Sequence, residues 1–381
     1  MAHATALIFH EVYRGRGFSP LQTSWNRYSL GYDLMASLGL FDNGVAVLRP
    51  TPATDAELRL AHTPEYIASV READTRGEGF LDRRDTPAWR GVFERAATAV
   101  GGTLLAARSI MAGDISHAFN PAGGLHHAQA DRASGFCIFN DLVIATRVLQ
   151  RDFGLTRIAT IDIDGHHGDG VQALLYDEPV LKISFHQYDG RFYPGTGAVD
   201  ELGAGAGHGY SVNVPLPRRV GDATYLAAFD ALVPPLLYSY RPQFILVQFG
   251  VDAHVGDPLV GLWLTTAAYQ GLVERLHELA HDLCDGCLLF LGGGGYNPPT
   301  VARCWTILMA TLSGALPAAS HDQYAALFDE SGAAPIEAPA TAEQVHAVVS
   351  DVQGRLLDAG WRVPGWRPAP SPSRKHSDPL G

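Results

Sequence analysis

The chain has 381 residues, of which 46% are apolar, enough material for one large α/β domain or two ordinary ones. Forty acidic residues against 28 basic ones give a formal net charge of −12, which argues against direct binding of nucleic acid because such proteins normally carry a basic face. No stretch approaches the roughly 18 consecutive apolar residues of a membrane span, so we expect a cytoplasmic protein without a membrane partner.

Five apolar segments predict strands, at residues 4–10, 157–164, 180–186, 243–252 and 286–296. They lack strict alternation, which is typical of strands buried on both faces of a parallel sheet. Helical periodicity predicts helices at residues 93–113, 139–152, 222–240 and 266–284. Strands that alternate with helices indicate right-handed βαβ units around one central parallel sheet.

The pattern changes near residue 330. One further helix is predicted at 342–360, and a segment rich in proline, serine and arginine follows it. We therefore expect a catalytic domain over 1–330 and, over 331–381, a C-terminal helix with a flexible tail. The CxxC of Cys284 and Cys287 is interpreted as reduced thiols beside a buried strand, because no second CxxC completes a zinc site.

Titratable side chains gather where three of the predicted strands end. The stretch IDIDGHHGDG carries Asp162 and Asp164, which close one strand, and continues with His166. Asp252 closes another strand, and Tyr296 follows a third one after four glycines. Because ligands of open parallel sheets bind beyond the carboxyl ends of the strands, we expect these groups to meet at one edge.

Two carboxylates and an imidazole, from Asp164, His166 and Asp252, form a plausible three-ligand metal site. Three protein ligands leave a coordination position open, as in catalytic zinc sites, and the same donors accept Fe²⁺ or Co²⁺. The alternative is that these residues only cap helices and form turns. We reject it because so many charges at a buried strand end need a compensating ion.

A second histidine pair, His126 and His127, lies in the stretch GGLHHAQADRASGFCIFND. Beside a metal, one of the two histidines can take a proton from the attacking water and deliver it to the leaving amine. Each would need a carboxylate to fix its tautomer, and Asp162 and Asp169 are available. The sequence therefore predicts an acid–base pair next to the metal.

The motifs GLHHA, GFCIFND, DIDGHHGDGVQ, FYPGTG, GVDAHVGDP and LGGGGYN occur in the order typical of one family. In these motifs the chain resembles the zinc-dependent histone deacetylase superfamily, which includes bacterial acetoin-utilisation proteins and acetylpolyamine amidohydrolases. The resemblance covers roughly residues 5–315 and is strongest to the bacterial acetoin-utilisation type. It implies an arginase-like α/β fold with a central parallel sheet of about eight strands between helices.

The resemblance also implies roles for the residues at the strand ends. Asp164, His166 and Asp252 match the metal ligands of the family. His127 matches the main general base and acid, assisted electrostatically by the preceding histidine. Tyr296 matches the tyrosine whose hydroxyl, together with the metal, polarises the acyl carbonyl and stabilises the oxyanion.

A substrate tunnel is implied as well. Phe136 and Tyr193 match its two aromatic walls, and Gly135 matches a glycine that lines it. Asp85 fits a loop aspartate that holds the substrate backbone, and Leu259 fits the tunnel rim. Tyr193 departs from the phenylalanine usual in the family, so we expect an altered preference for acyl chains or inhibitors rather than a loss of hydrolysis.

A structural K⁺ ion is the last implication of the resemblance. Members of the family hold it with backbone and side-chain oxygens. On this chain the matching residues are Asp162, Asp164, His166, Ser184 and Phe185.

We therefore expect an amidohydrolase that uses metal-activated water to remove a short acyl group, chiefly acetyl, from the ε-amine of lysine in proteins or peptides, and that hydroxamates inhibit. The main alternative is an acetylpolyamine amidohydrolase, since the net charge of −12 attracts a cationic substrate. A catalytically silent binding protein and a ureohydrolase are lesser alternatives. The oligomeric state stays open.

Overall fold

A computed structural model describes residues 5–15, 26–82, 85–316 and 322–367. Its centre is a single sheet of eight strands, all parallel, in the order β2-β1-β3-β8-β7-β4-β5-β6. The strands are β1 (Thr5–Ile8), β2 (Val45–Leu48), β3 (His117–Asn120), β4 (Ile158–Asp162), β5 (Leu181–Gln187), β6 (Ser211–Leu216), β7 (Phe244–Gln248) and β8 (Leu288–Leu291). The expected α/β fold with one central parallel sheet is confirmed.

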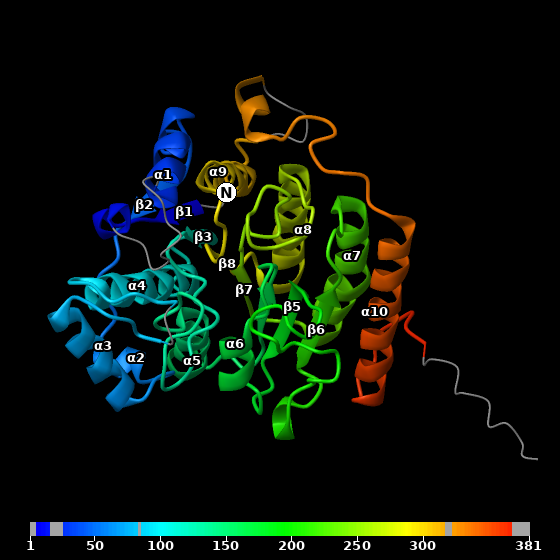
Figure 1. Ribbon diagram of the computed structural model, residues 1–381, viewed down its shortest axis with the longest axis horizontal. Coiled ribbons are helices and arrows are strands. Elements are labelled where there is room, and N and C mark those ends of the chain that lie inside the picture. The colour runs from blue at the N-terminus through cyan, green and yellow to red at the C-terminus, as the bar shows by residue number, and fades with distance from the viewer. Residues whose placement is uncertain (1–4, 16–25, 83–84, 317–321, 368–381) are drawn as a thin grey trace, which may run out of the picture.

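Helices cover both faces of this sheet (Figure 1). One group comprises α2 (Asp55–Leu58), α3 (Pro64–Arg76), α4 (Val92–Met111), α5 (Asp141–Phe153) and α6 (Asp169–Leu174). The other comprises α1 (Arg27–Ser37), α7 (Asp222–Tyr240), α8 (Thr266–Cys284), α9 (Pro298–Leu312) and α10 (Pro339–Asp358). The short 3₁₀ helices are η1 (Glu11–Arg14), η2 (Gly205–Gly207) and η3 (Asp322–Leu327).

The central strands β3, β8, β7 and β4 are buried along their whole length, which agrees with the mainly apolar sequences of β8, β7 and β4. All of them run in the same direction, so the loops that follow them leave from one edge of the sheet. These loops carry the titratable groups singled out at the strand ends, except Asp162, which is the last residue of β4. The sheet therefore determines where the site lies.

Two strand boundaries differ from expectation. The strand predicted to close at Asp252 ends at Gln248, and the strand predicted to close at Asp164 ends at Asp162. Asp164 and Asp252 consequently lie in loops just past the sheet edge, where their carboxylates can turn toward one another rather than alternate across a strand.

The C-terminal helix predicted at 342–360 corresponds to α10, which packs against α7 and β6. Beyond it, the Trp361 indole N–H donates a hydrogen bond to the Gly209 carbonyl, 2.8 Å away. The rest of the predicted flexible tail, residues 368–381, lies outside the described residues. The division into a catalytic domain and a C-terminal segment stays a prediction. No helix in the described part of the chain is long and apolar enough to cross a membrane.

Candidate metal centre and substrate pocket

Asp164, His166 and Asp252 converge past the ends of β4 and β7. All three side chains are buried, and one ligand atom from each lies within 4.8 Å of the others. Nδ1 of His166 is 2.9 Å from Oδ2 of Asp252 and 3.3 Å from Oδ1 of Asp164. Neighbouring strands thus bring together an Asp, His, Asp donor set of the kind predicted.

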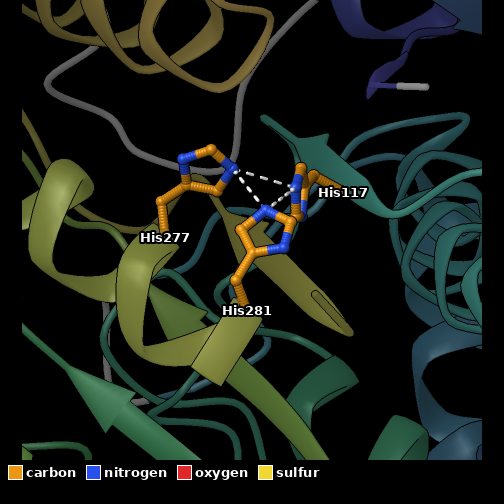
Figure 2. A group of neighbouring side chains, drawn as sticks. All are labelled: His117, His277 and His281. Carbon is orange, nitrogen blue, oxygen red and sulfur yellow. Dashed lines mark hydrogen bonds between the residues drawn. The ribbon is translucent and has the colours of Figure 1, made fainter. Parts of the chain in front are cut away.

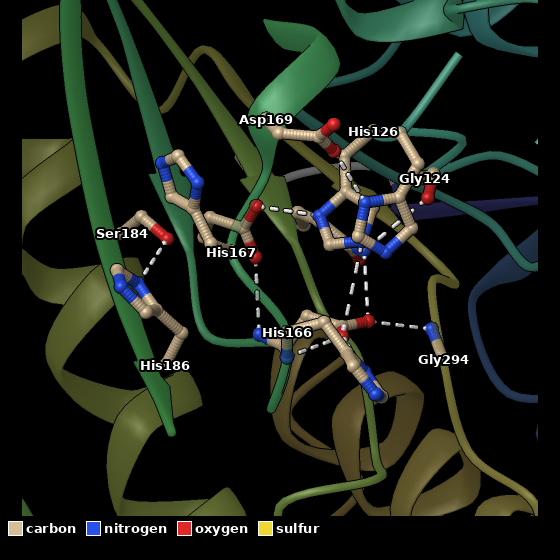
Figure 3. Close-up of polar contacts among 12 residues, drawn as sticks. Gly124, His126, His166, His167, Asp169, Ser184, His186 and Gly294 are labelled. Carbon is tan, nitrogen blue, oxygen red and sulfur yellow. Dashed lines mark hydrogen bonds and ion pairs between the residues drawn. The ribbon is translucent and has the colours of Figure 1, made fainter. Parts of the chain in front are cut away.

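The carboxylates of this set are oriented by surrounding donors (Figure 3). Asp164 Oδ2 accepts hydrogen bonds from the Gln248 side-chain amide at 2.9 Å and from the Gly294 backbone N–H at 2.7 Å. Asp252 Oδ1 accepts from the Gly165 backbone N–H at 2.7 Å. Such outer contacts fix carboxylate ligands of a metal and are part of a metal site's construction.

The charge of this group fits a divalent cation. Burial, reinforced by the charge of Asp164, raises the pKa of Asp252 to about 7. Burial opposes charging of His166, but the two aspartates outweigh it and raise its pKa to about 10. A divalent ion would neutralise the two carboxylates, and oxygen and imidazole donors suit Zn²⁺, Fe²⁺ or Co²⁺.

The backbone after β8 also fits an ion at this place. A Cβ atom on Gly294 would stand 2.3 Å from Asp252 Oδ2 and 2.7 Å from Asp164 Oδ2. Only glycine therefore lets this loop pass so close to the two carboxylates.

Two histidine–aspartate pairs lie beside the metal ligands. His126 Nδ1 is 2.7 Å from Asp162 Oδ2, and His127 Nδ1 is 2.6 Å from Asp169 Oδ1. The Gln129 amide donates to the other oxygen of Asp169 at 2.9 Å. Each carboxylate accepts the Nδ1 proton, so the Nε2 atom of each histidine is left for chemistry.

The two histidines differ in protonation. Burial disfavours charge on His126, but the carboxylates of Asp162 and Asp164 prevail and raise its pKa to about 9. Burial and the charge on His126 lower the pKa of His127 to about 4, although Asp169 opposes this. Near neutral pH and without a bound metal, His127 is therefore a free base and His126 carries a positive charge.

A pocket extends from this group to the surface. It is lined by Asp85, His127, Gly135, Phe136, His166, Arg191, Phe192, Tyr193, Leu259 and Tyr296. Tyr193 and Leu259 are 39% and 38% exposed, whereas His127 and His166 are 5% and 7% exposed. The first two residues thus lie toward the mouth of the pocket and the histidines at its base.

The aromatic walls are held by local backbone geometry. Phe136 adopts a positive φ of 65°, uncommon for a residue with a bulky side chain, directly after Gly135 at φ 50°. A Cβ on Gly135 would stand 2.5 Å from the His127 ring. On the opposite side, the Tyr193 ring packs edge-on against His127 with centroids 5.1 Å apart.

Tyr296 lies on the pocket wall, with its ring 5.9 Å from that of Phe136. Its backbone N–H donates to Asp257 Oδ2 at 2.8 Å, and the carbonyl of the preceding Gly295 accepts from the Arg27 guanidinium at 3.0 Å. Burial raises the pKa of the Tyr296 phenol well above its ordinary value. The hydroxyl therefore keeps its proton and can donate a hydrogen bond.

Three of the residues assigned to a K⁺ ion lie in the β4–β5 pair, and Asp164 and His166 follow β4 in the loop. Asp162 and Ser184 are register partners, and Phe185 is fully buried next to them. The Ser184 hydroxyl lies 2.9 Å from Nδ1 of His186 (Figure 3). The strand register thus places Asp162 beside Ser184, while the ion itself stays a prediction.

Several residues of the site were missed from the sequence. Phe192 stacks on the His166 ring at 5.0 Å and 15°, and Arg191 lines the pocket beside it. Phe192 stands in the FYPGTG motif next to Tyr193, which was a usable signal. Gln248 and Asp257 gave no such signal, because their roles depend on contacts between distant loops.

A parallel α/β sheet whose strand ends carry two His–Asp pairs, a buried Asp, His, Asp set and an aromatic pocket defines a metallohydrolase-type site. A family model for the histone deacetylase domain matches residues 22–312, and the chain belongs to the histone deacetylase family. Membership makes it an amide hydrolase of the deacetylase type and confirms the resemblance.

Curated relatives agree with the family match. The acetoin utilization protein AcuC of Bacillus subtilis (strain 168) is 40% identical over 300 residues, which cover 76% of this chain and 77% of the relative. Histone deacetylase 8 of Xenopus tropicalis is 35% identical over 297 residues, covering 76% and 78%. The acetoin utilization protein AcuC of Staphylococcus aureus (strain MSSA476) is 36% identical over 286 residues, covering 71% and 73%.

Proposed function

We propose that the protein hydrolyses the amide bond of Nε-acetyl-lysine, or of lysine bearing another short acyl group, in proteins or peptides. The observation that carries the proposal is the pocket lined by aromatic rings, with His127, His166 and Tyr296 along its wall and base. Aromatic walls suit the methylenes of an uncharged acyl-lysine side chain, whereas a charged lysine between them would lose its hydration without compensation.

Zn²⁺ is the ion we propose for Asp164, His166 and Asp252, with Fe²⁺ or Co²⁺ fitting the same ligands. When bound, such an ion supplies Lewis acidity toward the acyl carbonyl and lowers the pKa of water. K⁺ near Ser184 and Phe185 is proposed as a structural ion only.

The two histidines of the pair then have different roles in the reaction. His127, neutral near pH 7, accepts a proton from the attacking water at Nε2 and returns it to the leaving amine. Asp169 holds the tautomer that this requires. His126 stays charged against Asp162 and stabilises the negative charge that develops nearby.

The remaining residues bind and orient the substrate. The Tyr296 hydroxyl donates a hydrogen bond to the acyl oxygen, which gains negative charge as water adds. Phe136 and Tyr193 contact the methylenes of the lysine, and Gly135 leaves room between them. Asp85, exposed at the edge of the pocket, accepts from backbone N–H groups of a peptide, and Leu259 contacts it at the rim.

The test is amine release by Zn²⁺-reconstituted protein from an acetyl-lysine peptide, compared with N-acetylputrescine and acetylspermidine. We expect turnover of the peptide to predominate and to fall at least about 100-fold in Tyr296→Phe, the range seen when an oxyanion donor is removed. Preference for the polyamines would assign the alternative substrate class. Absence of turnover with any of the three substrates by metal-loaded protein would overturn the proposal.

A further inference from the structure

A second group of potential ligands lies apart from the strand ends that form the pocket. His117 begins β3, and His277 and His281 lie one turn apart near the end of α8 (Figure 2). Among the described residues, this group and the Asp164 group are the two that bring three such ligand atoms together. His117 is buried, and the two α8 histidines are partly exposed.

The three Nε2 atoms form a nearly equilateral triangle. Nε2 of His117 lies 3.1 Å from that of His281 and 3.0 Å from that of His277, and the two α8 atoms are 3.0 Å apart. The ring planes meet at 84°, 86° and 69°, so the rings surround a common axis instead of stacking. Figure 2 shows the nitrogens pointing toward one another.

Hydrogen bonds alone cannot account for this triangle. A ring nitrogen either carries a proton and donates, or carries a lone pair and accepts. Among three mutually close nitrogens, at least two must be in the same state, so at least one of the three contacts joins donor to donor or acceptor to acceptor. A cation that receives three lone pairs removes the conflict.

The dimensions suit a first-row transition metal. A Zn²⁺ ion held at the usual 2.0–2.1 Å from each nitrogen would lie about 1 Å outside the plane of the triangle. Ideal tetrahedral angles place ligand nitrogens about 3.3 Å apart, so the imidazoles need to move outward by only a few tenths of an ångström. Three imidazoles suit Zn²⁺, Cu²⁺, Ni²⁺ or Co²⁺ rather than Mg²⁺ or Ca²⁺.

The neighbouring backbone is shaped to this group. Gly286, in the turn from α8 to β8, has a φ of 80°, and a Cβ there would stand 3.1 Å from ring atoms of both His117 and His281. His117 is also the register partner of Leu288 at the start of β8. An ion at this place would join α8, β3 and the turn before β8.

We propose that His117, His277 and His281 form a second metal site, which takes Zn²⁺. It lies where β3 and β8 begin, whereas the loops that carry His127 and Tyr296 leave the other ends of these strands. In parallel sheets that opposite edge serves stability rather than chemistry. The ion therefore stabilises the pairing of β3 and β8 and takes no part in hydrolysis.

The experiment counts metal in the full chain after stripping with chelator, equilibration with Zn²⁺ and removal of excess. We expect two equivalents for the wild type and for His346→Gln, an exposed histidine on α10 that serves as the control. We expect one equivalent for Asp252→Asn, for His277→Gln and for His281→Gln, and none for Asp252→Asn combined with His281→Gln.

A second measurement uses Co²⁺ in the Asp252→Asn background. The visible absorption of tetrahedral, nitrogen-ligated Co²⁺ should appear there, and Zn²⁺ should raise the Tm in a concentration-dependent manner. Both effects should vanish with His281→Gln. One equivalent of Zn²⁺ in the wild type and none in Asp252→Asn would overturn the second site but not the proposed hydrolysis. This comparison does not require the histidine variants to fold.

Discussion

The hydroxyl of Tyr193 lies 2.7 Å from the Oγ of Ser134, so a hydrogen bond spans the pocket wall next to His127. A phenylalanine at 193 would lack this bond. The bond ties the exposed ring of Tyr193 to the segment that carries Gly135 and Phe136. The departure noted at this position therefore adds a contact between two segments that line the pocket.

Tyr193→Phe should keep deacetylase activity and relax selectivity for the acyl group. A hydrogen bond of this kind contributes about 1 kcal/mol of free energy. We therefore expect kcat/KM for the acetyl substrate to change less than about 10-fold. The ratio of butyryl to acetyl turnover should rise. Parallel kinetics with acetyl- and butyryl-lysine peptides measure this ratio.

Ser134→Ala is the matched control, because it removes the same bond from the other side. If the bond is responsible, the double variant should resemble either single one. Fully additive effects would assign the selectivity to the Tyr193 hydroxyl itself.

The two histidines of the pair should respond differently to substitution. His127→Gln removes the neutral base, so kcat should fall by roughly 10²–10⁴-fold. His126→Gln removes a charge but leaves the base, and its loss should be smaller by at least about 10-fold. Steady-state kinetics of both variants at equal metal content measure the difference. Equal losses would contradict the assignment of proton transfer to His127.

Removal of metal should abolish activity and be reversible. Because the ion binds the folded chain and not the unfolded one, its removal by chelator should also lower the Tm. Titrating Zn²⁺ back should restore both properties in the wild type. Asp252→Asn should stay inactive at the Zn²⁺ concentration that restores the wild type. Full activity in chelator-treated protein with no detectable metal would refute metal dependence.

Much of the fold was predictable because most of the central strands are mainly apolar. Segments such as β4 and β7 are buried on both faces, so their apolar composition is enough to predict them as strands. The strands β2, β3 and β6 were missed. β3 is the four-residue HAFN, and β6 carries Pro215, which an edge strand tolerates. Their pairing depends on neighbours far away in the sequence.

The candidate site was predictable for a related reason. Glycines and titratable residues cluster in short motifs, and parallel strands bring their carboxyl ends together. The histidines of the second site were missed although the spacing of His277 and His281, four residues apart on a helix, was visible in the sequence. His117 lies 160 residues earlier than His277, and only the sheet register places it beside them.

One buried histidine makes a prediction about pH and stability. His62 Nδ1 donates to the Gln129 carbonyl at 2.9 Å, and its Nε2 accepts from the Asn140 backbone N–H at 2.9 Å. Both nitrogens are thus used by the neutral ring, and protonation would break the second bond. Burial lowers the pKa of His62 to about 4, against the opposing pull of the Gln129 carbonyl.

Because the unfolded chain has an ordinary histidine pKa near 6.5, it binds a proton between about pH 6.5 and pH 4 that the native protein does not. The free energy of unfolding should therefore fall as the pH drops through this window, by up to about 3 kcal/mol from this residue. His62→Gln keeps a donor and an acceptor but cannot titrate, so its stability should decline less.

Urea unfolding of metal-free wild type, His62→Gln and the exposed control His346→Gln, measured from pH 7.5 to pH 4, checks this. The wild type and His346→Gln should lose stability together, while His62→Gln converges on them as the pH falls. Since His62 contacts the loop that follows His126 and His127, the same titration should loosen the acid–base pair. If the free energy of unfolding depended on pH in the same way in all three proteins, His62 would take up its proton in the native state over the same pH range as in the unfolded chain. That result would conflict with the hydrogen bond from Asn140.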